Sequence, residues 1–131
     1  RETALTQPAM AALEQVGLTA RAHTPVAALA LGERRQLEIA MVLATGAKCL
    51  LLDEPMAGMS PAESEAVVAL LRRLKGEHTI LLVEHDMDAV FALADRLTVL
   101  VYGRPIATGT PEQIRNQPEV REAYLGEAEH L

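Results

Sequence analysis

The feature that most constrains the fold is a short apolar run, residues 49–52, that ends at two adjacent carboxylates, Asp53 and Glu54. A continuous apolar run of this length predicts a strand covered on both faces, as in a parallel sheet. The carboxylates would then lie at the carboxyl end of the sheet, where open α/β sheets bind ligands. Two acids there suit a hydrated divalent cation and a water molecule to be activated. A buried strand followed by an exposed acidic turn without chemistry is the alternative interpretation.

Composition narrows the classes of protein to which the chain could belong. Its 131 residues, half of them hydrophobic, can bury the core of one domain or part of one. A formal net charge of −6 argues against a nucleic-acid partner. No apolar stretch approaches the roughly 18 residues of a membrane-spanning helix, so we expect no direct membrane insertion. Cys49 is predicted to be a small buried hydrophobe, and the start at Arg1 suggests an internal piece of a longer chain.

A second apolar run with a polar end follows the first. Residues 79–84 are predicted to form another buried strand, and His85 comes directly after it. Between the two runs, Ser60 and Glu63 have the spacing of a capping box at the N-terminus of a helix. The chain therefore repeats the order strand, polar tip, helix.

The last strands complete the predicted fold. Residues 96–101 are expected to form a third strand, residues 103–105 a turn, and residues 106–108 a short strand paired back as a hairpin. Strands that alternate with helices and are joined by crossovers imply parallel pairing with right-handed connections. We therefore predict an α/β fold with a mostly parallel sheet flanked by helices.

Residues 29–40 run from a loop into a helix that is predicted to start at Gly32 and to stop at Gly46. The apolar face of this helix carries Leu37, Ala40, Met41 and Ala44. Its start would leave free backbone N–H groups and a positive dipole end, which suit a phosphate oxygen. Any helix offers this, so the signal is weak by itself.

Four short motifs follow one another between Leu29 and Gly126. They are Leu29-Ala30-Leu31-Gly32-Glu33, the strand at 50–55, the loop at 57–61, and His85. Their order and spacing resemble the signature motif, Walker B strand, D-loop and switch histidine of an ABC-type ATPase, a P-loop NTPase fold. The resemblance implies that residues 1–45 end a helical subdomain with the signature motif. Residues 46–131 would run from Walker B through the switch region to the C-terminal tail.

The sequence of several stretches is similar to one subgroup of that family, the ATP-binding subunits of branched-chain amino-acid importers. The similar stretches are residues 36–40, 83–87, 102–105 and 119–126. Urea importers of the same subgroup look similar. In such systems membrane subunits and a binding protein contact the solute, so this chain alone does not identify it.

The resemblance also implies roles for individual residues. Asp53 would hold Mg²⁺ through water, Glu54 would act as general base on the attacking water, and His85 would contact the γ-phosphate of ATP. Catalysis of this kind is positioning plus electrostatics. The residues expected to contact ATP across a head-to-tail dimer are Leu29, Ala30, Leu31, Gly32, Glu33 and Ser60.

Two departures from the family pattern qualify these roles. Ala30 replaces the signature serine and Leu31 its first glycine, so we expect weaker or altered signature contacts. No G-x-x-x-x-G-K-S/T stretch occurs in the chain, and this loop cradles the β- and γ-phosphates. With the phosphate-loop half absent, we expect the chain alone not to hydrolyse ATP.

The resemblance implies partners and a location as well. A second ATPase subunit, identical or not, would complete the dimer, and permease subunits would hold it at the inner face of the cell membrane, in the cytoplasm. One alternative is a non-catalytic remnant or interaction module that pairs with a complete ATPase, motivated by Ala30 and Leu31. A DNA-repair type of ABC ATPase fits less well, because the chain is short between its motifs and lacks a coiled-coil insertion.

Overall fold

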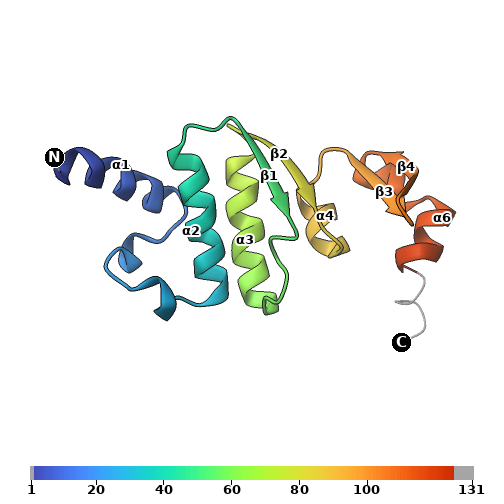
Figure 1. The fold of residues 1–131 in the computed structure, drawn as a ribbon. Coiled ribbons are helices and arrows are strands. Elements are labelled where there is room, and N and C mark those ends of the chain that lie inside the picture. Colours follow the sequence, from blue (N-terminus) through green and yellow to red (C-terminus); the bar gives the residue numbers. More distant parts are fainter. Residues whose placement is uncertain (1, 126–131) are drawn as a thin grey trace. The chain divides into compact units, whose positions relative to one another are not determined.

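Two parallel strands, β1 (Cys49–Asp53) and β2 (Thr79–Val83), form the first sheet of the computed structural model, which describes residues 2–125 (Figure 1). Cys49 pairs with Thr79 and Asp53 with Val83, so both strands end at the same edge. The predicted parallel pairing of the two apolar runs is confirmed. The carboxyl ends of the two strands therefore lie side by side, and the polar residues that follow each strand start at the same edge of the sheet.

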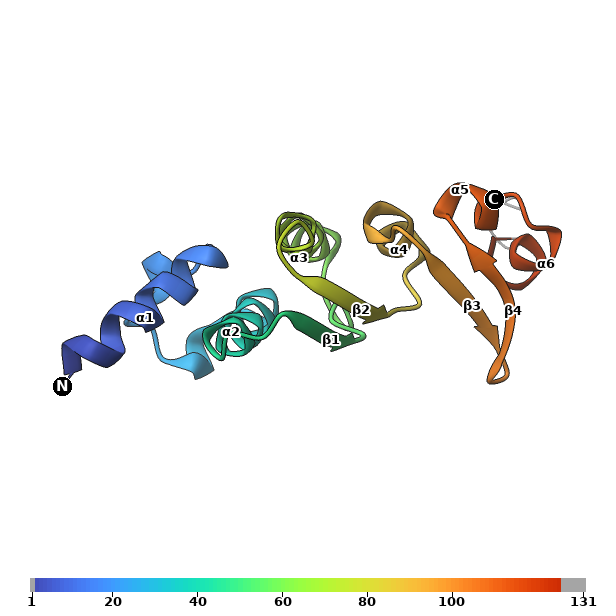
Figure 2. The ribbon, with the colours of Figure 1, turned by 90° about the horizontal axis from the view of Figure 1, so that it is seen from above.

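The prediction that these strands are covered on both faces is wrong for the part of the chain that the structure describes. Leu50 is 1% exposed, whereas its neighbour Leu51 is 73% exposed, and Leu81 and Val83 of β2 are 61% and 56% exposed. Cys49, predicted to be buried, is exposed as well. The reason is geometric: side chains alternate between the two faces of a strand, and α3 (Pro61–Leu74) lies over one face of the pair (Figure 2).

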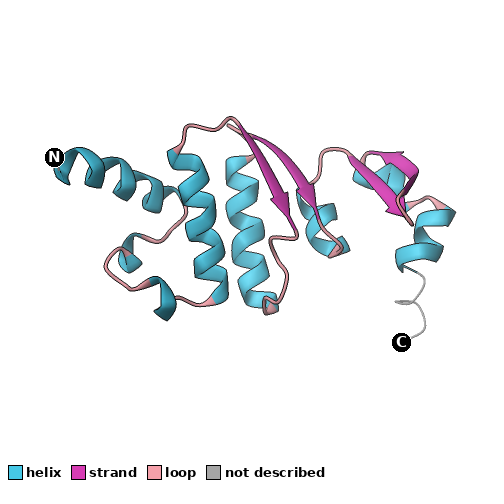
Figure 3. Cartoon of the chain, viewed as in Figure 1, coloured by secondary structure: helices cyan, strands magenta, loops and turns pink. Residues whose placement is uncertain are grey.

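Three helices accompany this strand pair in the first of two compact units, which ends at Glu84. They are α1 (Glu2–Gln15), α2 (Leu31–Ala44) and α3, and two 3-10 turns, η1 (Thr19–Arg21) and η2 (Val26–Ala28), join α1 to α2 (Figure 3). Helix α2 packs against both α1 and α3. The buried side of α3 consists of Val67, Leu70, Leu71 and Leu74. This apolar stripe, at helical spacing, holds the layer of helices to the strands.

The second unit begins at His85. Its described elements are α4 (Met87–Leu93), β3 (Leu97–Val101), β4 (Arg104–Gly109), α5 (Pro111–Arg115), α6 (Pro118–Val120) and a π-helical turn, η3 (Arg121–Leu125). Its core consists of Val99, Ile114 and Val120, against which Phe91, Leu97, Ile106 and Ala107 pack. The Arg115 guanidinium carbon lies 4.6 Å from the centre of the Phe91 ring. Gly126, the last residue of the motif at 119–126, lies outside the described residues.

Strands β3 and β4 form the predicted antiparallel hairpin, but its turn lies one residue earlier than expected. Tyr102 and Gly103 both have positive φ, 49° and 75°, which is the conformation of a two-residue type I′ turn. Arg104 and Pro105, predicted to be in the turn, therefore belong to β4. Pro105 is tolerated there because the strand register shifts at that point, and proline is found at such irregularities.

Among residues 2–125, no helix combines the length and the hydropathy that a bilayer crossing requires.

The packing of α3 makes a prediction about stability. Leu70 is 0% exposed, so Leu70→Ala should lower the free energy of unfolding by about 2–5 kcal/mol, through lost burial and the cavity left behind. Leu5→Ala is the matched control, because Leu5 also lies in a helix but is 75% exposed, and it should cost no more than about 0.5 kcal/mol. Urea unfolding of the 131-residue chain, followed by circular dichroism, measures both. Equal costs would contradict this packing.

Candidate functional site

Asp53 and Glu54 lie exposed where β1 ends. The backbone N–H of Glu54 donates to the carbonyl oxygen of Val83 at 2.7 Å, which carries the pairing with β2 one residue beyond the strand. Glu54 has φ of 46°, in the left-handed region that residues other than glycine seldom adopt. Such conformations cost about 1–3 kcal/mol and cluster at functional sites. The backbone thus leaves the strand direction at the residue that we predicted to be the general base.

Glu84, the residue after β2, holds the loop that follows Glu54. Its Oε2 accepts a hydrogen bond from the backbone N–H of Met56 at 3.4 Å. Pro55 and Met56 are themselves buried, so the loop is fixed by both packing and a polar contact. Sequence reasoning did not select Glu84. The available signal was its position, because it follows a strand that ends at the same edge as β1.

Residues 29–33 form the first turn of α2 and the approach to it. The helix begins at Leu31, one residue before the predicted start, and Ala30 is its N-cap residue. Alanine has no side-chain acceptor, so capping comes from the helix itself: the Glu33 carboxylate accepts the backbone N–H of Ala30 at 3.0 Å. Leu29 and Gly32 are buried, while Ala30 and Leu31 are exposed.

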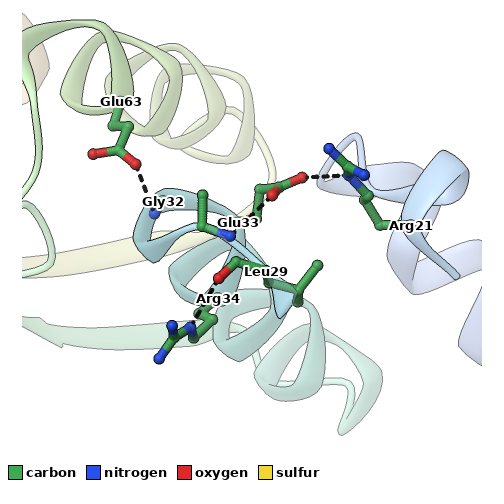
Figure 4. Close-up of polar contacts among 7 residues, drawn as sticks. Arg21, Leu29, Gly32, Glu33, Arg34 and Glu63 are labelled. Carbon is green, nitrogen blue, oxygen red and sulfur yellow. Dashed lines mark hydrogen bonds and ion pairs between the residues drawn. The ribbon is translucent and has the colours of Figure 1, made fainter. Parts of the chain in front are cut away.

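Two arginines support this turn (Figure 4). Arg21 Nε lies 2.7 Å from Glu33 Oε2, and Arg34 Nε donates to the carbonyl oxygen of Leu29 at 3.1 Å. The backbone N–H of Ala30, and next to it the Arg21 side chain, lower the pKa of Glu33. Sequence reasoning missed Arg21, because it lies 12 residues before Glu33 and no local pattern connects them.

The loop at residues 57–60 meets the first turn of α2 through Glu63. Ser60, the N-cap of α3, accepts the backbone N–H of Glu63 on Oγ at 3.3 Å, and Glu63 Oε2 accepts the Ser60 N–H at 2.9 Å. Oε1 of the same carboxylate accepts the Gly32 N–H at 3.5 Å (Figure 4). The Ser60 N–H, followed by that of Gly32, lowers the pKa of Glu63. Two predicted site residues, Gly32 and Ser60, are thus brought together by a third that the sequence identified only as a helix cap.

The sequence suggested that the backbone N–H groups at this helix start are free, but two of them are not. That of Ala30 is bonded to Glu33, and that of Gly32 to Glu63. A contact between this turn and a phosphate stays a prediction.

His85 is the first residue of the second unit and is exposed. It directly precedes Asp86, whose Oδ1 accepts the Ala89 N–H at 3.2 Å and caps α4. His85 thus lies in the short loop between the end of β2 and the start of α4. Its action beside Glu54 stays a prediction.

The donors at the carboxyl end of β1 fit Mg²⁺. Within residues 2–125, no group of three or more His, Cys, Asp or Glu side chains could hold a metal ion. Mg²⁺ commonly takes one or two carboxylates and completes its shell with water and substrate phosphates. The exposed Asp53 carboxylate can supply such a ligand.

Comparison with known protein families gives two matches. A family model described as "ABC transporter" matches residues 1–57. A second, described as "Branched-chain amino acid ATP-binding cassette transporter", matches residues 104–130.

Curated relatives agree with these matches. The chain is 48% identical over 118 residues to the high-affinity branched-chain amino acid transport ATP-binding protein BraF of Pseudomonas aeruginosa and, to the same extent, to LivG of Escherichia coli K12. These alignments cover 88% of this chain and 46% of each relative, so the chain spans about half the length of the relatives it matches. The lipopolysaccharide export protein LptB of Haemophilus influenzae is 39% identical over 101 residues, which are 76% of this chain and 42% of LptB.

Solved structures with the same fold are ATP-binding cassettes. One is an ABC transporter cassette in its ADP conformation, with a TM-score of 0.80 and 29% identity over 92% of this chain and 49% of that one. Another is cbiO1 from Clostridium perfringens, part of the transporter complex cbiONQ, with a TM-score of 0.80 and 30% identity over 94% of this chain and 50% of that one. The fold is thus that of an ABC-type P-loop NTPase. The chain belongs to the ABC transporter family of ATP-binding cassettes, within which it is similar to the ATP-binding proteins of branched-chain amino acid transport.

Proposed function

We propose that this chain is part of the ATP-hydrolysing subunit of an importer for branched-chain amino acids. The observation that carries the proposal is the edge where β1 ends at Asp53 and Glu54 follows it in the left-handed region. The names of BraF and LivG support branched-chain amino acids as the transported solute, and urea is the alternative. Since the chain spans about half of these relatives, we expect hydrolysis only from the complete gene product.

Glu54 is proposed to accept a proton from the attacking water as general base. Its carboxylate is exposed at the sheet edge, and its backbone is tied to Val83, so the base has a defined position. Asp53, one residue earlier, would hold Mg²⁺ through water. When bound, Mg²⁺ neutralises charge on the β- and γ-phosphates. His85 would contact the γ-phosphate and help to order the water.

Residues 29–33 and Ser60 are proposed to contact ATP that is bound to a second subunit. The bridge from Gly32 to Ser60 through Glu63 joins the turn that carries the exposed Ala30 and Leu31 to Ser60. This supports one continuous contact surface rather than two separate ones. Such a dimer would power permease subunits from the cytoplasmic face of the membrane. Loss of the signature serine at Ala30 favours a second candidate, a module that lends this surface to a complete ATPase without hydrolysing ATP itself.

Replacing the proposed base tests the first candidate. In the complete gene product, Glu54→Gln should lower ATP turnover by about 10²–10⁴-fold, the usual contribution of a general base, because the amide cannot accept the water proton. ATP binding, measured by titration with a fluorescent nucleotide, should persist. Glu77→Gln, an exposed change of the same kind, should leave turnover unaltered. Undiminished turnover in Glu54→Gln would remove Glu54 from this role. No turnover in the parent protein, together with stimulation of a complete ATPase mixed with it, would favour the module.

Restoring the signature serine tests the proposed contact at position 30. Ala30 is exposed and has the backbone geometry of an N-cap residue, so the hydroxyl of Ala30→Ser can accept the Glu33 N–H. The helix cap should add about 0.5–2 kcal/mol to the free energy of unfolding. If position 30 also meets ATP, turnover should rise. Ala62→Ser, the same change at an exposed position within α3, should alter neither. A gain in stability without a gain in turnover would overturn the contact.

A further inference from the structure

One carboxylate connects the first turn of α2, at Gly32, with the N-cap of α3, at Ser60. Glu63 Oε2 accepts the Ser60 N–H at 2.9 Å, and Oε1 accepts the Gly32 N–H at 3.5 Å, the long end of hydrogen-bond distances. Gly32 is buried, and a buried amide left without a partner is costly. The Glu63 carboxylate therefore provides the acceptor that the first turn of α2 needs.

The side chain of Glu63 also packs against the backbone of Gly32. A Cβ at position 32 would lie 3.3 Å from both Cβ and Cγ of Glu63, closer than ordinary contact. Glycine thus permits the approach, and the approach brings the amide to the carboxylate. Packing and hydrogen bonding place the two residues together independently of each other.

A second contact joins the same two segments. Gly58 has φ of +76°, and a Cβ there would lie 3.3 Å from Cδ2 of Leu31. Leu31, the leucine in place of the signature glycine, therefore lies against the loop at residues 57–60. The first turn of α2 thus meets this loop through Leu31 and Gly58, and the first turn of α3 through Gly32 and Glu63.

Capping of α3 alone does not require a charged residue at position 63. The second unit contains an equivalent capping box in which glutamine serves: Gln113 Oε1 accepts the Thr110 N–H at 3.0 Å, and Thr110 Oγ1 accepts the Gln113 N–H at 3.2 Å. In Glu63 the Ser60 and Gly32 N–H groups approach different oxygens, so a carboxylate serves both, whereas a glutamine in the same position would present an NH2 group to one of them. The carboxylate of Glu63 is needed for the bridge rather than for the cap.

We propose that Glu63 is a positioning residue that locks the first turn of α2 to the loop at residues 57–60. The surface formed by the exposed residues Ala30, Leu31 and Ser60 then meets a second subunit with a fixed shape. This inference rests on the proposed function, because a fixed surface matters to turnover only if the surface meets ATP across a dimer.

The substitution Glu63→Gln separates the bridge from the cap. It keeps the side-chain stem and the oxygen that serves Ser60, but it puts an NH2 donor where Oε1 accepts the Gly32 N–H. Glu65→Gln is the matched control, since it removes the same charge from an exposed position on the same helix. Both are made in the complete gene product, where Glu65→Gln should leave the unfolding temperature unchanged and Glu63→Gln should lower it by only a few degrees, because one hydrogen bond is lost.

Two measurements then decide the inference. Amide hydrogen exchange, followed by NMR without nucleotide, should become about tenfold faster at Gly32 in Glu63→Gln, as expected for loss of one charge-assisted hydrogen bond, with no change at Ser60. ATP turnover should fall several-fold, and the fall should shrink at high protein concentration if dimer formation is impaired. Glu65→Gln should change neither quantity.

Each outcome has a separate meaning. Unchanged exchange at Gly32 would overturn the bridge. Faster exchange with unchanged turnover would overturn the positioning role and leave a purely structural contact. Absence of ATP turnover in the parent would refute the proposed function, and the positioning role with it. The parent carries the native Glu63 carboxylate, so this result is distinct from a loss of turnover seen only in Glu63→Gln.

Discussion

The in-register parallel pairing of β1 with β2 is the constraint on which the site at the sheet edge depends. Because Asp53 lies opposite Val83, the residues that follow both strands start from the same edge. The Glu54 N–H continues the ladder to Val83, and the Glu84 carboxylate holds the next turn of the loop through Met56. A shift of one residue would exchange the faces of every side chain and separate these groups. The carboxylates are thus positioned by backbone hydrogen bonds.

Carboxylates also determine the character of the first turn of α2. Glu33 and Glu63 each accept a backbone N–H at this turn, where the helix dipole favours negative charge. Both have a lowered pKa, since the bonded N–H groups stabilise the ionised form. Arg21 balances one of the two charges. An incoming phosphate would therefore meet a turn in which two backbone donors, those of Ala30 and Gly32, already serve carboxylates of the chain.

Local patterns predicted much of this arrangement, and contacts distant in sequence were beyond them. The strand ends at Asp53, the capping box at Ser60 and the hairpin after β3 follow from spacing alone. An apolar run does not say which of its faces is covered, so the exposure of Leu51 was missed. The Arg21–Glu33 pair joins residues that no periodicity connects. Likewise, the Gly32–Glu63 contact arises only when α2 packs on α3.

The two departures from the signature pattern become understandable in the same physical terms. Ala30 lacks the hydroxyl that would cap the helix, and the Glu33 carboxylate caps it from within instead. Leu31 lacks the freedom of glycine, but its side chain lies against Gly58 and contributes packing that a glycine could not. The shape of the turn is thus maintained by side-chain contacts with neighbouring segments rather than by local backbone preference. The turn and the loop at residues 57–60 are thus joined by direct packing, because Leu31 lies against Gly58.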